Sequence, residues 1–416
     1  MRVDARLAVV LLATALGCGS SSSNNSGTDS GTGGGQDSGY NGPDGSADST
    51  VPDAGDAGRP TDGGDSGGPL LDGGFNGAVF YVTNDDGTLY AFQVGSWTQI
   101  GKWTGLPLTD GVRGIDADPV SGILYIAHGG DDLTSNGHLL AWSLTQNRTV
   151  YDKALGHGID QLAFGGGRIY MPAGELAATT TWYVLSAQDG SQVGTETGGS
   201  YPHNTIYLNG HHYYGGRQSD SLVVAGIGAG AGTIGPTPSA QTGVRPFTVN
   251  AAETRVWITW TAYRGFSIGD VPTGALVTSV NFGPVPNSYT PTAASHGISL
   301  SPSGSELYVL DTPLNTVRVY DGTDNPQLLA TIPFQHNIYP GNENPCAYDC
   351  PKDGWILHSR DGKYVYIGDS GDVVDTASRT VAGFIPPLQN DRHGFIEIEW
   401  SGGVPTGTTT HFGRSY

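Results

Sequence analysis

Charged side chains are scarce in this chain, and basic ones are the scarcest. Asp, Glu, Lys and Arg make up 14% of the 416 residues, and 19 Lys and Arg stand against 39 Asp and Glu, which gives a formal net charge of −20. A chain of this charge is repelled by phosphate backbones and by anionic membrane surfaces. We therefore exclude nucleic acid as a partner and expect any membrane contact to run through an anchor.

Cysteine and the common catalytic motifs are almost absent. The three cysteines are Cys18 near the N-terminus and the pair Cys346 and Cys350 in a Pro-rich loop. The sequence holds no Walker A loop, no His-Glu-x-x-His zinc motif and no Cys-x-x-Cys-His haem site. In an exported protein so close a pair predicts a small disulfide between Cys346 and Cys350, with free thiols or a metal site as the alternatives.

Long apolar runs are also missing, and the longest one lies at the N-terminus. It covers Leu7 to Leu16, follows Arg2 and Arg6, and is too short to span a bilayer, so residues 1–17 read as a secretory signal peptide. Its end, Ala-Leu-Gly-Cys, resembles a bacterial lipobox, although Ala15 stands where Leu is usual. The resemblance implies lipidation of Cys18 and a place in the cell envelope, at the outer membrane or in the periplasm; secretion with an unlipidated Cys18 is the alternative.

Residues 18–75 contain almost no large apolar side chain. Between residues 19 and 75 there are nine Asp and one Arg among many Gly and Ser. Such a segment cannot bury enough apolar surface to offset its chain entropy. We expect a disordered, acidic tether that holds the following domain clear of the lipid.

From residue 76 onward, short β-rich runs alternate with Gly-containing turns. The clearest unit is SHGISLSPSGSELYVLDT, residues 295–312, followed by two more strand-like runs at 315–322 and 327–334. The same template fits at five other places, about 40 to 58 residues apart: 112–127, 156–171, 202–215, 244–259 and 353–368. This period is typical of the four-stranded blades of a β-propeller.

The first and last units are each incomplete. AVFYVTN (78–84) and the two runs after it lack an inner strand, whereas HGFIEIEW (393–400) matches an inner strand and has no blade of its own. Pairing them closes the ring and removes the exposed edges of an open array. The sequence therefore predicts an all-β, seven-bladed propeller over residues 76–416, closed by its C-terminal strand.

Two strings resemble a known family. YVTN (81–84) and SPSGSELYV are similar to the repeats of the YVTN β-propeller family of exported bacterial proteins, and residues 352–376 are similar to the last blade of soil-bacterial members. The resemblance implies the fold. It does not imply one function, because propellers of this kind serve binding, scaffolding and several chemistries.

Aligning the copies selects one position, just before the apolar core of each inner strand. Because inner strands line the central channel of a propeller, we expect these residues to converge at one mouth. The position is occupied by Arg113, His157, His203, Arg245, His296, Gly354 (beside Asp353) and His393.

Such a ring predicts binding of an anionic ligand, either a carboxylate-bearing small molecule or an acidic polysaccharide, by a monomeric protein. Arg113 and Arg245 would clamp the anion and Asp353 would approach it, while the four histidines form hydrogen bonds.

Two other functions use the same residues. A lyase acting on uronate polysaccharides, or a lactonase-like enzyme, would use a histidine as base and Tyr213 or Tyr214 as acid. A divalent metal, as aid to such an enzyme or as a centre of its own, would be held by histidines of the ring: His157, His203, His296 and His393. The remaining alternative is a non-catalytic interaction scaffold whose ring residues satisfy backbone carbonyls and channel water.

Two further histidine pairs invite structural interpretations. His128 and His138 flank the string GGDDLTSNG, which we interpret as a solvated surface loop rather than a calcium site, and the adjacent His211 and His212 are expected to be structural.

Overall fold

The computed structural model describes the chain from residue 74 to residue 409 with internal gaps. The described ranges are 74–108, 111–130, 136–175, 177–226, 232–235, 243–289, 291, 293–344 and 351–409. The predicted signal peptide, the lipidated Cys18, the tether up to residue 73 and the Cys346–Cys350 pair lie outside these ranges and stay predictions. Within them, no helix has the length and apolar character needed to cross a bilayer.

The regular structure is antiparallel β-sheet, as the sequence predicts. The first three four-stranded sheets are β4–β7 (Val112–Asp118, Ile123–Gly129, Gly137–Ser143, Arg148–Ala154), β8–β11 (Ala163–Gly165, Arg168–Ala173, Thr181–Ser186, Gln192–Thr197) and β12–β15 (Pro202–Leu208, His211–Gly216, Leu222–Ala225, Thr233–Ile234). The next three are β16–β19 (Val244–Val249, Arg255–Trp260, Gly265–Asp270, Leu276–Asn281), β20–β23 (Ile298–Leu300, Glu306–Asp311, Thr316–Asp321, Leu328–Pro333) and β24–β27 (Ile356–His358, Tyr364–Ile367, Asp372–Asp375, Thr380–Phe384). Two short 3-10 helices occur in the described ranges, η2 (Thr312–Leu314) and η3 (Pro386–Asn390).

The seventh sheet joins the two ends of the described chain. Its strands are β1 (Gly77–Asn84), β2 (Thr88–Gln93), β3 (Thr98–Trp103), β28 (Phe395–Ser401) and β29 (Val404–Thr408). The C-terminal strand β28 pairs with β1 in the register Tyr81↔Ile396, so the predicted closure of the ring is confirmed. The prediction of a seven-bladed propeller is therefore confirmed as well.

One strand of this sheet was not predicted. β29 follows the tight turn at Gly402 and Gly403 and pairs with the free edge of β28, with Ile398 opposite Thr408. Its residues, Val-Pro-Thr-Gly-Thr, carry little strand signal, and Pro405 cannot donate a ladder hydrogen bond. The strand forms at an edge, where a proline is tolerated.

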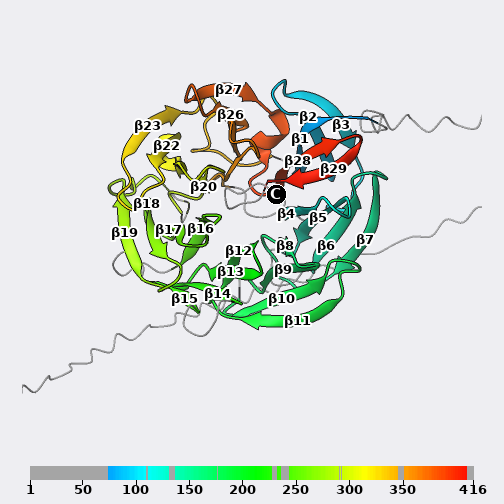
Figure 1. Cartoon of the computed structure of the whole chain (residues 1–416), viewed down its shortest axis with the longest axis horizontal. Helices are drawn as coiled ribbons and strands as arrows, with labels where there is room; N and C mark the ends of the chain where they lie inside the picture. The colour runs from blue at the N-terminus through cyan, green and yellow to red at the C-terminus, as the bar shows by residue number, and fades with distance from the viewer. Residues whose placement is uncertain are drawn as a thin grey trace, which may run out of the picture. The chain divides into compact units, whose positions relative to one another are not determined.

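The sheets stand as blades around one axis (Figure 1). In the six four-stranded blades the first strand faces the axis, whereas in the closing blade β29 pairs with the edge of β28 that is opposite to β1. The successive strands β28, β4, β8, β12, β16, β20 and β24 contact their neighbours around most of the ring. The hydrophobic core lies between adjacent blades: Trp400 and Ile396 of the closing blade pack with Leu124 and Trp142 of the next one. This packing holds the starts of the inner strands in a fixed ring at one mouth.

Candidate functional site

Three of the predicted ring residues sit at irregularities of the sheet ladder. Three inner strands each have one register shift: β4 between Val112 and Gly114, β12 between Pro202 and Asn204, and β16 between Val244 and Phe247. Arg113, His203 and Arg245 lie within these slips. A β-bulge re-aims side chains locally, and bulges are common next to functional sites. The repeated sequence position therefore coincides with a repeated backbone feature.

The structure places three of the four predicted ring histidines in a continuous row. The ring centroids of His203 and His296 are 5.9 Å apart, and those of His296 and His393 are 6.0 Å apart. Trp355 contacts both His296 and His393 edge-on, with centroids at 5.6 and 5.1 Å. Residues from four blades thus converge at the channel mouth.

Buried carboxylates join the predicted basic residues on one side of the cluster. Arg113 Nη2 lies 2.5 Å from Glu175 Oε2 and 3.3 Å from Asp160 Oδ1. Arg217 Nη1 lies 2.6 Å from the other oxygen of Glu175, and His203 donates from Nδ1 to Asp160. Both carboxylates are almost completely buried. None of these partners of the two predicted basic residues was identified from the sequence.

A second charged group lies on the other side of the row. Arg392 Nε is 2.9 Å from Asp353 Oδ1 and 3.5 Å from Asp369 Oδ2. Asp353 Oδ1 is also 3.3 Å from His296 Nδ1, so the predicted ligand-binding Asp353 belongs to the cluster. Asp369 accepts hydrogen bonds from the backbone N–H groups of Asp353 and Gly354.

The expectation of a mainly basic hub therefore needs correction. Carboxylates offset the guanidiniums of the cluster, which brings together Arg113, Arg217, Arg245 and Arg392 with Asp160, Glu175, Glu343, Asp353 and Asp369. Burial alone would raise the pKa of Glu175, but Arg113, His203 and Arg217 outweigh it and hold that pKa below its ordinary value. Glu175 is an ion-pair partner and not a proton donor near neutral pH.

Burial and neighbouring guanidiniums both act on two imidazoles of the row, His296 and His393. Burial is the largest cause that lowers the pKa of His296 well below its ordinary value, and Arg245, His203 and Arg392 lower it further. The pKa of His393 is lowered for the same reasons, by burial first and then by Arg392, His296 and Arg113. Both imidazoles are neutral near pH 7, and the guanidiniums near them would stabilise an added negative charge.

Hydrogen bonds define what these imidazoles offer. Since a carbonyl oxygen only accepts, the 2.9 Å contact between His296 Nδ1 and Gly354 O places the proton on Nδ1 and leaves Nε2 as an acceptor. His393 Nε2 is buried and has no hydrogen-bond partner among the described residues. Buried polar atoms are usually paired, so this nitrogen is a candidate contact for a bound molecule.

One predicted ring histidine, His157, lies apart from the cluster. His157 is exposed, and none of the contacts described for the cluster involves it. His296 and His393 each precede their strand by two residues, whereas β8 is short and begins only at Ala163, so Asp160 reaches the hub instead of His157. The repeat pattern predicts this blade correctly, but the start that it predicts for the inner strand is wrong.

The proposed acids Tyr213 and Tyr214 also point elsewhere. The hydroxyl of Tyr213 donates to Glu253 at 2.7 Å, in the turn between β16 and β17, and that of Tyr214 donates to the carbonyl of Thr197. The pKa of Tyr213 is raised above its ordinary value by burial and by Glu253. Neither hydroxyl contacts the histidine row in the described structure.

The hub is poorly suited to a metal ion. Asp160, Glu175 and His203 place ligand atoms within 4.8 Å of one another, as a metal would require. However, the guanidiniums of Arg113 and Arg217 already occupy positions beside these carboxylates. A divalent cation would have to displace them against their charge. The suggested ligand set of His157, His203, His296 and His393 also lacks His157 in the row.

The missed residues carry a recognisable signal. Glu175, Arg217 and Asp369 each follow the second strand of a blade, and that strand ends at the mouth where the first strand begins. The predicted ring includes only residues that stand just before the apolar cores of the first strands. Aligning the residues that follow the second strands as well would identify Glu175 and Asp369, the counter-charges of Arg113 and Arg392.

Comparisons with known proteins agree on the fold alone. No family model matches the chain, and no curated protein matches it. Among solved structures it is similar to a chain of a mitotic checkpoint complex (12% identity, TM-score 0.52, covering 71% of this chain and 89% of that one) and to U3-55K (12% identity, TM-score 0.50, covering 71% and 88%). The Cps50 (Swd1) β-propeller domain of Myceliophteria thermophila has 10% identity and a TM-score of 0.49, covering 72% and 96%. The protein is a β-propeller scaffold.

Proposed function

We propose that this protein is an exported propeller that binds a small hydroxylated carboxylate, such as a uronic acid or the end of an acidic glycan, at the channel mouth. The observation that carries the proposal is the row His203–His296–His393, which runs beside Arg245 and Arg392. A guanidinium binds carboxylate oxygens in a fork-like geometry. The acceptor nitrogen of His296 suits a ligand hydroxyl, and His393 Nε2 can bind either kind of group.

Burial limits the size of this ligand. His203, Arg245, His296 and His393 expose between 1% and 4% of their surfaces. A molecule that crosses the mouth would not contact them, so a ligand must enter the channel with one end. We therefore favour a small acid or a terminal sugar over an internal segment of a polysaccharide.

The charge balance of the hub supports specificity more than affinity. Guanidiniums paired with buried carboxylates are held in fixed positions, and breaking these pairs to bind a metal or a bare cation is costly. An anion that binds beside the imidazoles leaves the pairs intact. Binding of the anion would raise the pKa of His296 and His393. The affinity should therefore increase as the pH falls toward the pKa that these histidines have in the unliganded protein.

A thermal-shift panel tests this function. Purified protein is screened with hexuronates, aldonates, hydroxy acids and the neutral sugars that correspond to them, at pH 6 and pH 7.5. We expect stabilisation by acids and not by their neutral counterparts, and a loss of the effect in His393→Leu. His157→Leu is the matched control, since the same substitution falls on an exposed histidine outside the row.

The same mixtures distinguish binding from catalysis. A lyase or lactonase would convert an acid that stabilises the protein, and mass spectrometry would detect the product. We expect none, because the hydroxyls of Tyr213 and Tyr214 are directed to other partners. If no compound in the panel stabilises the protein, the interaction-scaffold alternative replaces the proposal.

We also propose that the protein is lipid-anchored in the cell envelope through Cys18. The support is the signal-like N-terminus and its lipobox-like end at Gly17. Mass spectrometry of the mature N-terminus should find an acylated Cys18, and Cys18→Ala should release the propeller from the membrane fraction. An unmodified Cys18 in a soluble fraction would contradict this part of the proposal.

A further inference from the structure

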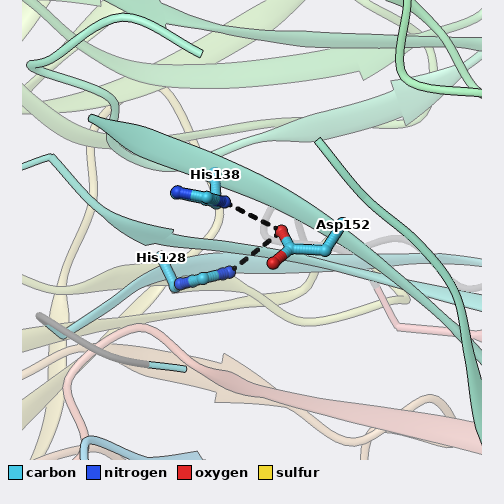
Figure 2. Close-up of side chains that lie close together, drawn as sticks. All are labelled: His128, His138 and Asp152. Carbon is cyan, nitrogen blue, oxygen red and sulfur yellow. Dashed lines mark hydrogen bonds and ion pairs between the residues drawn. The ribbon is translucent and has the colours of Figure 1, made fainter. Parts of the chain in front are cut away.

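Three metal-ligating side chains meet on the second, third and fourth strands of one blade. His128 lies in β5, His138 in β6 and Asp152 in β7. His128 and His138 are directly opposite each other in the ladder, and their imidazoles stack with centroids 5.0 Å apart. Figure 2 shows both rings directed at the carboxylate of Asp152.

The distances among the three side chains match those of a metal site. Asp152 Oδ1 is 3.4 Å from His128 Nε2 and 3.0 Å from His138 Nδ1. In a tetrahedral site with metal–ligand bonds of about 2.0–2.1 Å, neighbouring ligand atoms lie about 3.3 Å apart. All three ligand atoms lie within 4.8 Å of one another. A single ion between them would need only small side-chain movements.

The surroundings differ from those of the hub carboxylates. In the described part of the chain, the ion-pair partners of Asp152 are the two imidazoles alone, whereas guanidiniums hold Asp160 and Glu175. The side chain of His128 is 2% exposed, while those of His138 and Asp152 are 33% and 25% exposed. The group is thus buried at His128 and open to solvent at His138 and Asp152, where an ion and a fourth ligand can enter.

The backbone holds the three residues in place before any ion binds. Adjacent strands of a sheet fix their side chains at short cross-strand and diagonal separations. β5 and β6 pair without a break, and the β6–β7 ladder is regular from His138 to Ala141, with Leu140 opposite Asp152 and Ala154 opposite His138. Pre-organised ligands lose little conformational freedom on binding.

We propose that His128, His138 and Asp152 form a site for a divalent first-row transition metal, Zn²⁺ in the first instance. Two imidazole nitrogens and one carboxylate oxygen suit Zn²⁺, Co²⁺, Ni²⁺ or Cu²⁺, whereas Ca²⁺ and Mg²⁺ prefer oxygen ligands. Three protein ligands leave one position for water or another small ligand. The site lies at the same end of its blade as the hub, because His128 is opposite Val112, the neighbour of Arg113.

Metal titration of the untagged full chain tests the proposal. We expect one equivalent of Zn²⁺ by calorimetry, and an absorption spectrum of tetrahedral or five-coordinate cobalt with Co²⁺. His138→Ala and Asp152→Asn should each weaken Zn²⁺ binding at least 10-fold. Both positions are partly exposed, so these variants should melt like the parent chain, which circular dichroism checks.

Two control variants assign the site. His211→Ala removes a histidine that also contacts a carboxylate, Glu253, at 2.5 Å but has no second histidine in that contact, and it should leave the affinity unchanged. The double variant Cys346→Ser/Cys350→Ser should also bind normally. Absence of Zn²⁺ binding by the parent chain overturns the proposal, and so does retained affinity in His138→Ala or loss of binding in either control.

Discussion

The guanidinium of Arg113, at the start of β4, lies 2.5 Å from the carboxylate of Glu175, which follows β9 in the next blade. The side chains of Arg113 and Glu175 are buried, and Glu175 forms a second ion pair with Arg217 at 2.6 Å. The pair connects two blades at the channel mouth. It shows that the hub of this propeller is held by charge pairs between blades and not by a ring of like charges.

Removing this carboxylate should strongly destabilise the fold. Glu175→Gln removes the carboxylate that Arg113 and Arg217 share and leaves Asp160 as a remaining acidic partner of Arg113. Breaking a buried ion pair typically costs about 3–5 kcal/mol. Urea unfolding at pH 7 should therefore show a large loss in the free energy of unfolding. Glu306→Gln is the control, since its pair with Arg379 is partly exposed and should cost at most about 1 kcal/mol. Equal losses of unfolding free energy in the two variants would show that the buried hub pair stabilises the fold no more than a partly exposed pair does.

Loss of the C-terminal strands should open the ring. A chain that ends at Arg392 lacks β28 and β29 and leaves the edge of β1 unpaired. An exposed β-edge promotes association of chains. Light scattering after size exclusion should find oligomers or aggregates, and the thermal transition should broaden.

A chain that ends at Thr409 is the control for this truncation, because it keeps both strands. It should elute as a monomer and melt like the full chain. A monomeric, cooperatively melting chain without β28 would contradict the role of closure in stability.

Buried His358 should make stability depend on pH. Burial lowers its pKa to about 3, against about 6.5 in an unfolded chain. Below pH 6.5 the unfolded state therefore binds a proton that the folded state does not, so the wild-type chain loses stability as the pH falls, by about 1.4 kcal/mol per pH unit from this group. Above pH 6.5 the histidine is neutral in both states and has no effect.

The variant His358→Gln isolates this contribution. It should be less stable than the wild type at pH 7.5, because the ring that contacts Ser299 and Tyr308 is lost. Between pH 6.5 and pH 5 the gap should narrow by about 2 kcal/mol. Urea unfolding at a series of pH values measures the gap, and a constant gap would mean that His358 titrates alike in both states.

The fold could be predicted from the sequence because its signal is repeated. Strand patterns of one template recur along the chain, and the unmatched run at 393–400 could only complete the unit at 78–84. β29 was missed because its Pro and Gly residues give no strand pattern. A short edge strand is stabilised by pairing with one neighbouring strand, here β28. The intrinsic strand propensity of its own residues does not record that pairing.

The site was predictable only in part. The convergence of six residues could be predicted because each lies at, or just before, the start of an inner strand: Arg113, His203, Arg245, His296, Asp353 and His393. His157 was misplaced because the exact start of a short strand depends on pairing across the sheet. The charge partners Asp160, Glu175, Arg217, Asp369 and Arg392 could not be predicted, because counter-charges are set by three-dimensional proximity, which one aligned column does not contain.

The most direct test of the hub as a ligand site is calorimetry with galacturonate and galactose, which differ in the carboxylate. The wild-type protein should bind galacturonate, more tightly at pH 6 than at pH 7.5, and should not bind galactose. His393→Leu should weaken galacturonate binding at least 10-fold, and His157→Leu should leave it unchanged. Equal binding of the two sugars, or full affinity in His393→Leu, would contradict recognition of an acid by the histidine row.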